Sequence, residues 1–164
     1  MKRVIIIGCP GGGKSTFARA LSEKTGLPLY HLDMLYWNAD RTTVEREVFR
    51  ARLAEVMVRD EWIIDGNYAS TMETRMERCD TVFFLDMPLD ICLAGVEARR
   101  GMPRPDMPWV ENEADEDFIA FIKSFISESR PKILALLEKY NGKTVVQFKN
   151  RDEVVEYLKN FQKI

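Results

Sequence analysis

A glycine-rich segment near the start of the chain has the residue types and spacing of a phosphate-binding loop. It fits the pattern G-x-x-x-x-G-K-[ST], with Gly8 at its start and Lys14-Ser15 at its end. Glycines leave room for successive backbone N–H groups and a helix N-terminus to point at one anion. The residues that we expect to bind nucleotide phosphates here are Gly8, Gly11, Gly12, Gly13, Lys14, Ser15 and Thr16.

The two residues that close this pattern predict the chemistry of the bound ligand. Lys14 would place a positive charge against the β- and γ-phosphates of ATP, and the Ser15 hydroxyl would be a ligand of the accompanying Mg²⁺. The alternative is a plain glycine-rich turn. The apolar run at residues 4–7 and the helical pattern at 16–21 favour the phosphate loop, because this motif joins a strand to a helix.

Three carboxylates follow apolar runs that read as strands: Asp33, Asp65 and Asp86. Ligands of parallel α/β sheets gather at the carboxyl ends of the strands. We expect Asp65 to hold the Mg²⁺ shell, and Asp33 either to accept the proton of a substrate hydroxyl or to join that shell. Asp86, followed by Met87-Pro88, is expected to fix a turn. Capping of a turn or helix is the alternative for each carboxylate.

Arginines flank a segment that is rich in proline and acidic residues. Phosphoryl transfer needs positive charge around the γ-phosphoryl oxygens, and a closing lid can supply it while excluding water. We therefore expect a small lid over about residues 101–130, with Arg99 and Arg130 as catalytic residues and Arg100 and Arg104 as nucleotide ligands. Incidental arginines on a solvated loop are the alternative.

The acceptor side is predicted from residues that follow the second and third strands. These are Tyr36, Trp37, Arg41, Asn67, Tyr68 and Arg75. For Tyr36 and Trp37 the alternative is aromatic packing beneath a loop rather than stacking on a base or sugar. His31, the only histidine, is expected to be structural.

These residues require a scaffold of strands that alternate with helices. Continuous apolar runs predict buried parallel strands, and amphipathic segments between them predict helices. Pro131 predicts a break near Arg130 in an otherwise helical segment. The predicted strands lie at residues 4–7, 27–33, 62–67, 81–86 and 144–148.

The composition is that of an ordinary globular protein. At 164 residues, with 46% apolar and 30% charged residues, we expect one domain over 1–164. No apolar run is long enough to span a membrane and the start reads as a strand rather than a signal peptide, so we expect a cytoplasmic protein. Three cysteines without C-x-x-C spacing fit a reducing compartment and argue against a zinc site.

The balance of basic and acidic residues indicates which kinds of partner the protein binds. With 24 basic and 26 acidic residues, the chain lacks the positive excess of proteins that bind nucleic acids directly. We expect a small-molecule acceptor as the partner, and neither a membrane nor DNA. The sequence does not distinguish a monomer from an oligomer.

Taken together, several segments resemble a bacterial family, the DNA topology modulation proteins, within the adenylate-kinase-like or nucleoside-monophosphate-kinase-like P-loop group. The resemblance lies in residues 8–15, 30–33 with Tyr36-Trp37, 62–68, 84–86 and Arg130-Pro131. It implies a three-layer α/β/α fold with a five-stranded parallel sheet in the order 2-3-1-4-5, ATP on the P-loop and an arginine-bearing lid. It also implies that Asn150 and Arg151 border the adenine.

One departure concerns the acceptor. Adenylate kinases follow the third strand with Gly-Phe-Pro-Arg, whose arginine binds the acceptor phosphate, whereas this chain has Gly66-Asn67-Tyr68-Ala69. The hypothesis is an ATP-dependent kinase whose acceptor is a nucleotide or nucleoside. Two alternatives stay open: a nucleotide-gated regulator with an indirect effect on DNA topology, and a metabolite kinase of the shikimate or gluconate type. An anionic acceptor would need arginines converging beneath the lid, and a base would need an aromatic slot.

Overall fold

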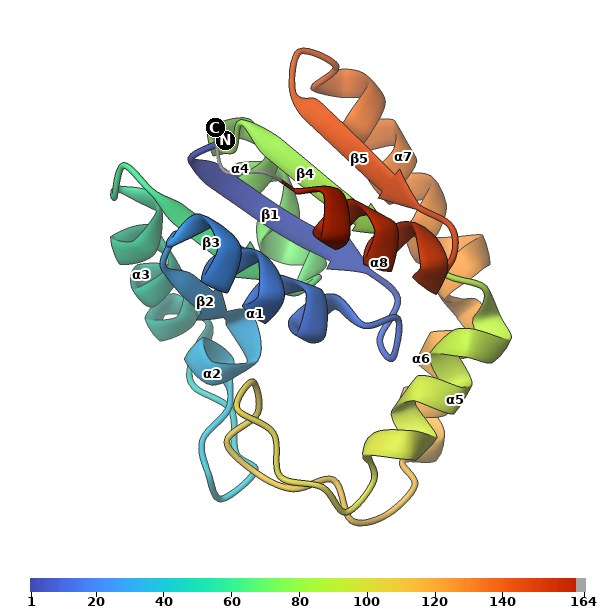
Figure 1. Ribbon diagram of the computed structural model, residues 1–164. Coiled ribbons are helices and arrows are strands. Elements are labelled where there is room, and N and C mark those ends of the chain that lie inside the picture. The colour runs from blue at the N-terminus through green and yellow to red at the C-terminus, as the bar shows by residue number, and fades with distance from the viewer. Residues whose placement is uncertain (162–164) are drawn as a thin grey trace.

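The computed structural model describes residues 1–161, in which a five-stranded sheet is flanked by helices (Figure 1). The strands are β1 (Arg3–Gly8), β2 (Leu29–His31), β3 (Trp62–Asp65), β4 (Thr81–Leu85) and β5 (Thr144–Phe148). The helices are α1 (Lys14–Thr25), α2 (Leu32–Tyr36), α3 (Arg46–Met57), α4 (Ala69–Arg78), α5 (Leu89–Arg99), α6 (Glu116–Ser124), α7 (Arg130–Lys139) and α8 (Arg151–Asn160), with a π-helical turn η1 (Phe125–Ser129).

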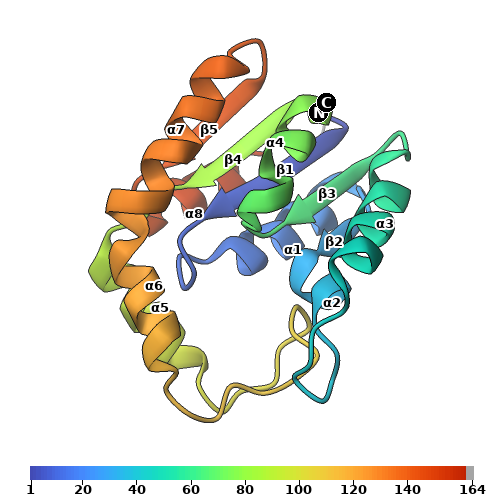
Figure 2. The same ribbon diagram turned by 180° about the vertical axis from the view of Figure 1, so that it is seen from behind.

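All strand pairs are parallel and the sheet has the order β2-β3-β1-β4-β5, which confirms the predicted fold class. Helices α1 and α8 cover one face, and α4 and α7 cover the other, with α3 beside α4 (Figures 1 and 2). Strands β1, β3 and β4 are buried along almost their whole length, since helices cover both of their faces. Their carboxyl ends therefore meet at one edge of a rigid core.

The second strand is shorter than predicted. It ends at His31, and Leu32 begins the short helix α2, so that Asp33 lies in the first turn of that helix rather than at the end of a strand. Leu32 is buried and packs against Gly66 just beyond β3. With Leu32 packed in this way, the chain leaves β2 at His31, and Asp33 lies at the carboxyl edge of the sheet.

Helix α4 lies in a segment for which no helix is predicted. Its buried residues are Thr71, Met72, Arg75 and Met76, so two of its four core-facing positions are polar. The buried residues of α4 have helical spacing, but because two of them are polar the sequence shows no apolar periodicity in this segment.

The break or kink predicted near Arg130 corresponds to a π-helical turn within a helical segment that runs without interruption over residues 116–139. Helix α6 passes into the π-helical turn η1, and α7 begins at Arg130 with Pro131 in its first turn. Pro131 has no N–H to donate to a preceding carbonyl, and the wider π-helical turn lies directly before it.

The segment from residue 101 to 115 contains no helix or strand. It leaves the end of α5, runs across to α2 and the residues that follow it, and returns to α6 (Figure 1). We call these residues the lid loop. Among residues 1–161, no helix is both long and apolar enough to cross a membrane.

Candidate active site

The phosphate-loop segment connects β1 to α1 at the carboxyl edge of the sheet. Gly8, Gly11 and Gly13 have φ values of 145°, 78° and 95°, which side chains rarely adopt. A Cβ on Gly11 would lie 2.0 Å from the carbonyl oxygen of Cys92 in α5, so the close contact with this helix requires glycine. Helix α1 has no side-chain cap at its N-terminus. Its first amides are thus available to an anion.

Lys14 is held over this loop. Its ammonium donates a 3.1 Å hydrogen bond to the carbonyl of Cys9. Burial lowers the pKa of Lys14, partly offset by the charge of Asp65, and the charge of Arg99 lowers it further. The negative charge of a phosphate group placed here would favour the protonated form of Lys14.

Ser15 and Asp65 meet at the end of β3. The Ser15 hydroxyl donates a 2.7 Å hydrogen bond to Oδ2 of Asp65, and Nδ1 of His31 lies 2.8 Å from the same oxygen. The other carboxylate oxygen, Oδ1, is buried and has no hydrogen-bond partner among residues 1–161. A buried, unpartnered carboxylate oxygen beside a hydroxyl fits a Mg²⁺ ion or its water shell.

The protein alone does not enclose a metal ion here. In the described part of the chain, no three histidine, cysteine or acidic side chains are grouped so that they could hold one. An ion near Ser15 and Asp65 would therefore need oxygens from phosphate and water, which is how Mg²⁺ is usually bound beside nucleotides.

Asp33 lines the same cavity as Lys14 and Ser15 and is paired with Tyr68. The phenol of Tyr68 donates a 2.5 Å hydrogen bond to Oδ1 of Asp33. Burial raises the pKa of Asp33, and this hydrogen bond partly offsets the rise, while the charges of Asp65 and Asp106 add to it. A carboxylate with a raised pKa is a better proton acceptor than an ordinary exposed one.

Arg75 does not reach the cavity. It is fully buried, and its guanidinium donates to the backbone carbonyls of Gly66, Asn67 and Tyr68. Burial lowers its pKa to about 10. The Asn67 side chain is also committed, because it bonds both to the amide and to the carbonyl of Gly8. Both residues hold the loop that follows β3.

The lid loop carries its own ion pairs. Arg99 contacts Glu111 at 3.0 Å, and Arg104 contacts both Glu111 at 3.5 Å and Asp106 at 3.0 Å. Asp106 is buried and also lies 3.4 Å from Arg19 of α1. Burial lowers the pKa of Arg99, and the charge of Arg104 lowers it further. The carboxylates thus pair with Arg99, whose charge acts on Lys14, and with Arg104, which does not line the cavity.

Aromatic contacts dock the lid loop on the residues after α2. Trp109 packs edge-on against Trp37 with ring centroids 5.5 Å apart. Arg41 donates a 3.1 Å hydrogen bond to the carbonyl of Val110 and lies 5.1 Å over the Trp109 ring. At the base of the loop, the Gly101 amide donates to the carbonyl of Glu111 at 2.7 Å.

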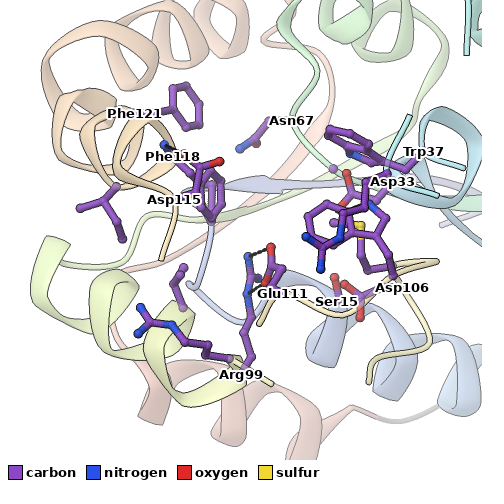
Figure 3. Close-up of a pocket in the computed structure, with 18 of the residues that line it drawn as sticks. Ser15, Asp33, Trp37, Asn67, Arg99, Asp106, Glu111, Asp115, Phe118 and Phe121 are labelled. Carbon is purple, nitrogen blue, oxygen red and sulfur yellow. Dashed lines mark hydrogen bonds and ion pairs between the residues drawn. The ribbon is translucent and has the colours of Figure 1, made fainter. Parts of the chain in front are cut away.

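The phosphate loop, α2, the loop after β3, α5, the lid loop and α6 line a partly open cavity of about 720 Å³. Figure 3 shows Asp33 and Trp37 on one side of it and Phe118 and Phe121 on the other. The predicted site residues that line it are Lys14, Ser15, Asp33, Tyr36, Trp37, Arg41, Asp65, Asn67, Tyr68, Arg99 and Arg100.

Several predicted residues are placed elsewhere. Arg130 makes a bidentate ion pair with Asp86 at 2.8 Å, where Asp86 also accepts from Gln147. Asn150 caps α8 through a hydrogen bond from the Glu153 amide, and Arg151 begins that helix. None of these residues lines the cavity.

Other cavity residues are absent from the sequence-based set. Asp106, Trp109, Glu111 and Phe118 line the cavity. The only signal for them in the sequence is the predicted lid itself.

The fold and the phosphate loop define the class of protein that this chain resembles, which is that of small-molecule P-loop kinases. No family model matches the chain. An adenylate kinase of Thermotoga neapolitana is 28% identical over 88 residues, which are 52% of this chain and 39% of that protein. The chain therefore spans about two fifths of the length of the adenylate kinases that it matches.

Shikimate kinases match over more of their length. The shikimate kinase of Phocaeicola vulgatus is 25% identical over 147 residues, 80% of this chain and 81% of that protein. A crystal structure of shikimate kinase from Bacteroides thetaiotaomicron superposes with a TM-score of 0.62 at 19% identity, covering 96% of this chain and 94% of that one. The fold is thus shikimate-kinase-like, and the sequence is distantly similar to both kinds of kinase.

Proposed function

We propose that this protein is a phosphotransferase that moves the γ-phosphoryl group of Mg-ATP to a hydroxyl of a small acceptor. The observation that carries the proposal is one cavity that is lined both by Lys14 and Ser15 of the phosphate loop and by Asp33. A donor site and a proton acceptor that share one cavity favour transfer over simple nucleotide sensing.

In this proposal the amides of the phosphate loop and of α1 bind the phosphates, and Lys14 balances their charge. When bound, Mg²⁺ would neutralise phosphate oxygens, and Ser15 and Asp65 would hold it. Arg99 would stabilise the charge that develops on the transferred group, after exchanging Glu111 for phosphate oxygens.

Asp33 would act as the base. The acceptor oxygen forms a bond to the γ-phosphorus, the bond from that phosphorus to the β,γ-bridging oxygen breaks, and ADP leaves. The proton of the acceptor hydroxyl passes to Asp33. Tyr68 fixes the orientation of the carboxylate by bonding to Oδ1, which leaves Oδ2 for the acceptor.

The resemblance to the DNA topology modulation proteins is kept as part of this proposal. We do not infer from it that the protein contacts DNA directly. Formal charge is −2 over the chain, which fits a small-molecule enzyme. An effect on DNA topology would then be indirect.

Titration calorimetry with Mg-ATP tests the donor site, and transfer from labelled ATP to a panel of small alcohols tests the reaction. Lys14→Ala should abolish transfer and leave the melting temperature within a few degrees of the parent. A folded parent protein that takes up no Mg-ATP would contradict the proposal.

A further inference from the structure

The acceptor half of the cavity, defined by Asp33, Tyr36, Trp37, Tyr68 and Trp109, has a chemistry of its own. Its polar groups are one carboxyl, two phenols and two indole N–H groups, and its apolar surface is made of aromatic rings. The charges that act on Asp33 are those of Asp65, Asp106 and Lys14. Lys14 is the sole cation in that set, and it belongs to the phosphate loop.

Each cation that lines the cavity has a partner in the described structure, and the proposed function already uses Lys14 and Arg99 for the phosphates of ATP. Arg41 is bonded to Val110 and covers Trp109, Arg99 is paired with Glu111, and Arg100 is paired with Glu97 at 2.5 Å. Lys14 lies over the phosphate loop. Arg75, which could have served an acceptor anion, is buried behind the loop after β3.

Acidic residues outnumber these cations. Seven carboxylate side chains line the cavity, three of them exposed (Glu113, Asp115 and Glu116), against the four lining cations Lys14, Arg41, Arg99 and Arg100. A phosphate or carboxylate on the acceptor would face the less exposed carboxylates of Asp33, Asp65, Asp106 and Glu111 and would share the cavity with a triphosphate. Without a dedicated cation it would lose the charge-assisted hydrogen bonds that anions need when they are removed from water.

In place of cations, the acceptor half offers aromatic side chains for contact with a ligand. Trp37 packs edge-on against both Tyr36 and Trp109, with centroids 5.5 Å apart in each pair. Phe118 and Phe121 face Trp37 and Asp33 from the opposite side of the cavity (Figure 3). Such walls favour a planar ring, because every aromatic ring has a face on which another can stack.

We infer that the acceptor is an uncharged alcohol that carries a planar ring, such as a nucleoside, rather than a nucleoside monophosphate or a carboxylated sugar. This inference rests on the proposed function. In it, the ring lies against the aromatic side chains of the acceptor half and a hydroxyl lies against Asp33.

The test compares matched acceptors on the intact protein. Adenosine, guanosine, cytidine and thymidine are each paired with their 5′-monophosphates, with shikimate as a carboxylated alcohol, and kcat/KM is measured with labelled Mg-ATP. We expect nucleosides to be preferred over their monophosphates by about 10- to 100-fold, the effect of leaving one buried charge unpaired.

A pair of variants tests the aromatic wall. Trp37→Leu should raise KM for the nucleoside by about tenfold, the effect of losing one stacking contact. It should leave the dissociation constant for Mg-ATP unchanged. Trp37→Phe, which retains a ring, should recover most of the loss. An unchanged KM in Trp37→Leu would contradict the role of the ring.

The outcomes separate this inference from the proposed function. Preference for a monophosphate or for shikimate would overturn the inference and leave the phosphotransferase standing. Binding of Mg-ATP with no phosphorylation of any nucleoside would overturn it as well. Failure to bind Mg-ATP would instead overturn the proposed function.

Discussion

Tyr68 donates a 2.5 Å hydrogen bond to Oδ1 of Asp33, although the two residues lie 35 positions apart in the chain. Asp33 belongs to the first turn of α2, and Tyr68 precedes α4 in a left-handed backbone conformation with φ of 39°. Because a non-glycine residue in this conformation stores strain, the surrounding structure must hold it there. The three carbonyl contacts of Arg75 provide that support.

The first prediction concerns the charge of Asp33. Its pKa is raised in the folded protein, mainly by burial, so its contribution to stability is present at acid pH and is lost as pH rises through the folded-state pKa. Asp33→Asn keeps the oxygen that Tyr68 bonds to. It should raise the melting temperature near neutral pH by about 2–4 °C and have less effect at acid pH, while transfer falls by about 100-fold or more. Equal stabilisation at all pH values would contradict this account.

The second prediction concerns the partner of this carboxylate. Tyr68→Phe removes the hydrogen bond that favours the ionised form, so the pKa of Asp33 should rise further. The acid limb of the rate–pH profile should move to higher pH, and Asp33→Asn should lack that limb. Tyr140→Phe is the control, since Tyr140 contacts Glu73 at the surface instead. A profile that moves equally in both tyrosine variants would reject the assignment.

The third prediction concerns magnesium. Asp65→Asn should raise the Mg²⁺ concentration needed for half-maximal ATP binding by about 10- to 100-fold, as loss of a supporting carboxylate does at other metal sites. Chelation of Mg²⁺ should abolish transfer. Asp86→Asn removes the carboxylate that pairs with Arg130, at a site outside the cavity, and should leave the Mg²⁺ requirement unchanged. Equal effects of the two variants would argue against a metal role for Asp65.

The fourth prediction concerns the contact between α5 and the phosphate loop. A Cβ on Gly95 would lie 2.1 Å from the carbonyl oxygen of Gly11. Gly95→Ala should therefore destabilise the fold by about 1–3 kcal/mol and weaken ATP binding, although alanine is the better helix former. Gly142→Ala, where a Cβ meets nothing within 4 Å, is the matched control. Denaturant unfolding of both variants measures the two free energies of unfolding, and only that of Gly95→Ala should fall.

The fifth prediction concerns the docking of the lid loop. Arg41→Ala removes the hydrogen bond to Val110 and the contact with Trp109, at a position whose own φ of 67° is strained. Opening of residues 101–115 should become more frequent by about 5- to 30-fold, which corresponds to ~1–2 kcal/mol.

Limited proteolysis within the lid loop measures this opening, and hydrolysis of ATP without acceptor should increase as water gains entry. Arg50→Ala, at an exposed position of α3, provides the comparison. Resistance of the lid loop to protease in Arg41→Ala would show that other contacts hold it closed.

The scaffold could be predicted because its signals are local. The apolar runs of β1, β3 and β4 and the glycines before Lys14 are visible within a few residues of sequence. The strand order came from a family resemblance rather than from periodicity. The early end of β2 could not be predicted, because it depends on packing of Leu32 against Gly66.

The site could be predicted only where a motif specifies it. Arg75 was predicted to face the substrate because arginines usually bind anions, yet it is buried among backbone carbonyls, and no local pattern distinguishes the two fates. Likewise, Arg41 finds its partner Val110 69 positions away. Such pairs exist only once the chain has folded.

The contact of Gly11 with α5 has a consequence for access to the cavity. Since backbone meets backbone there without intervening side chains, α5 cannot slide relative to the loop beside it. Movement of small molecules into and out of the cavity then depends on residues beyond the end of that helix, where the Gly101 amide bonds to the Glu111 carbonyl within the lid loop. Entry and exit would involve detachment of about a dozen residues from Arg41 and Trp37, a local event on the microsecond-to-millisecond scale rather than a rearrangement of the core.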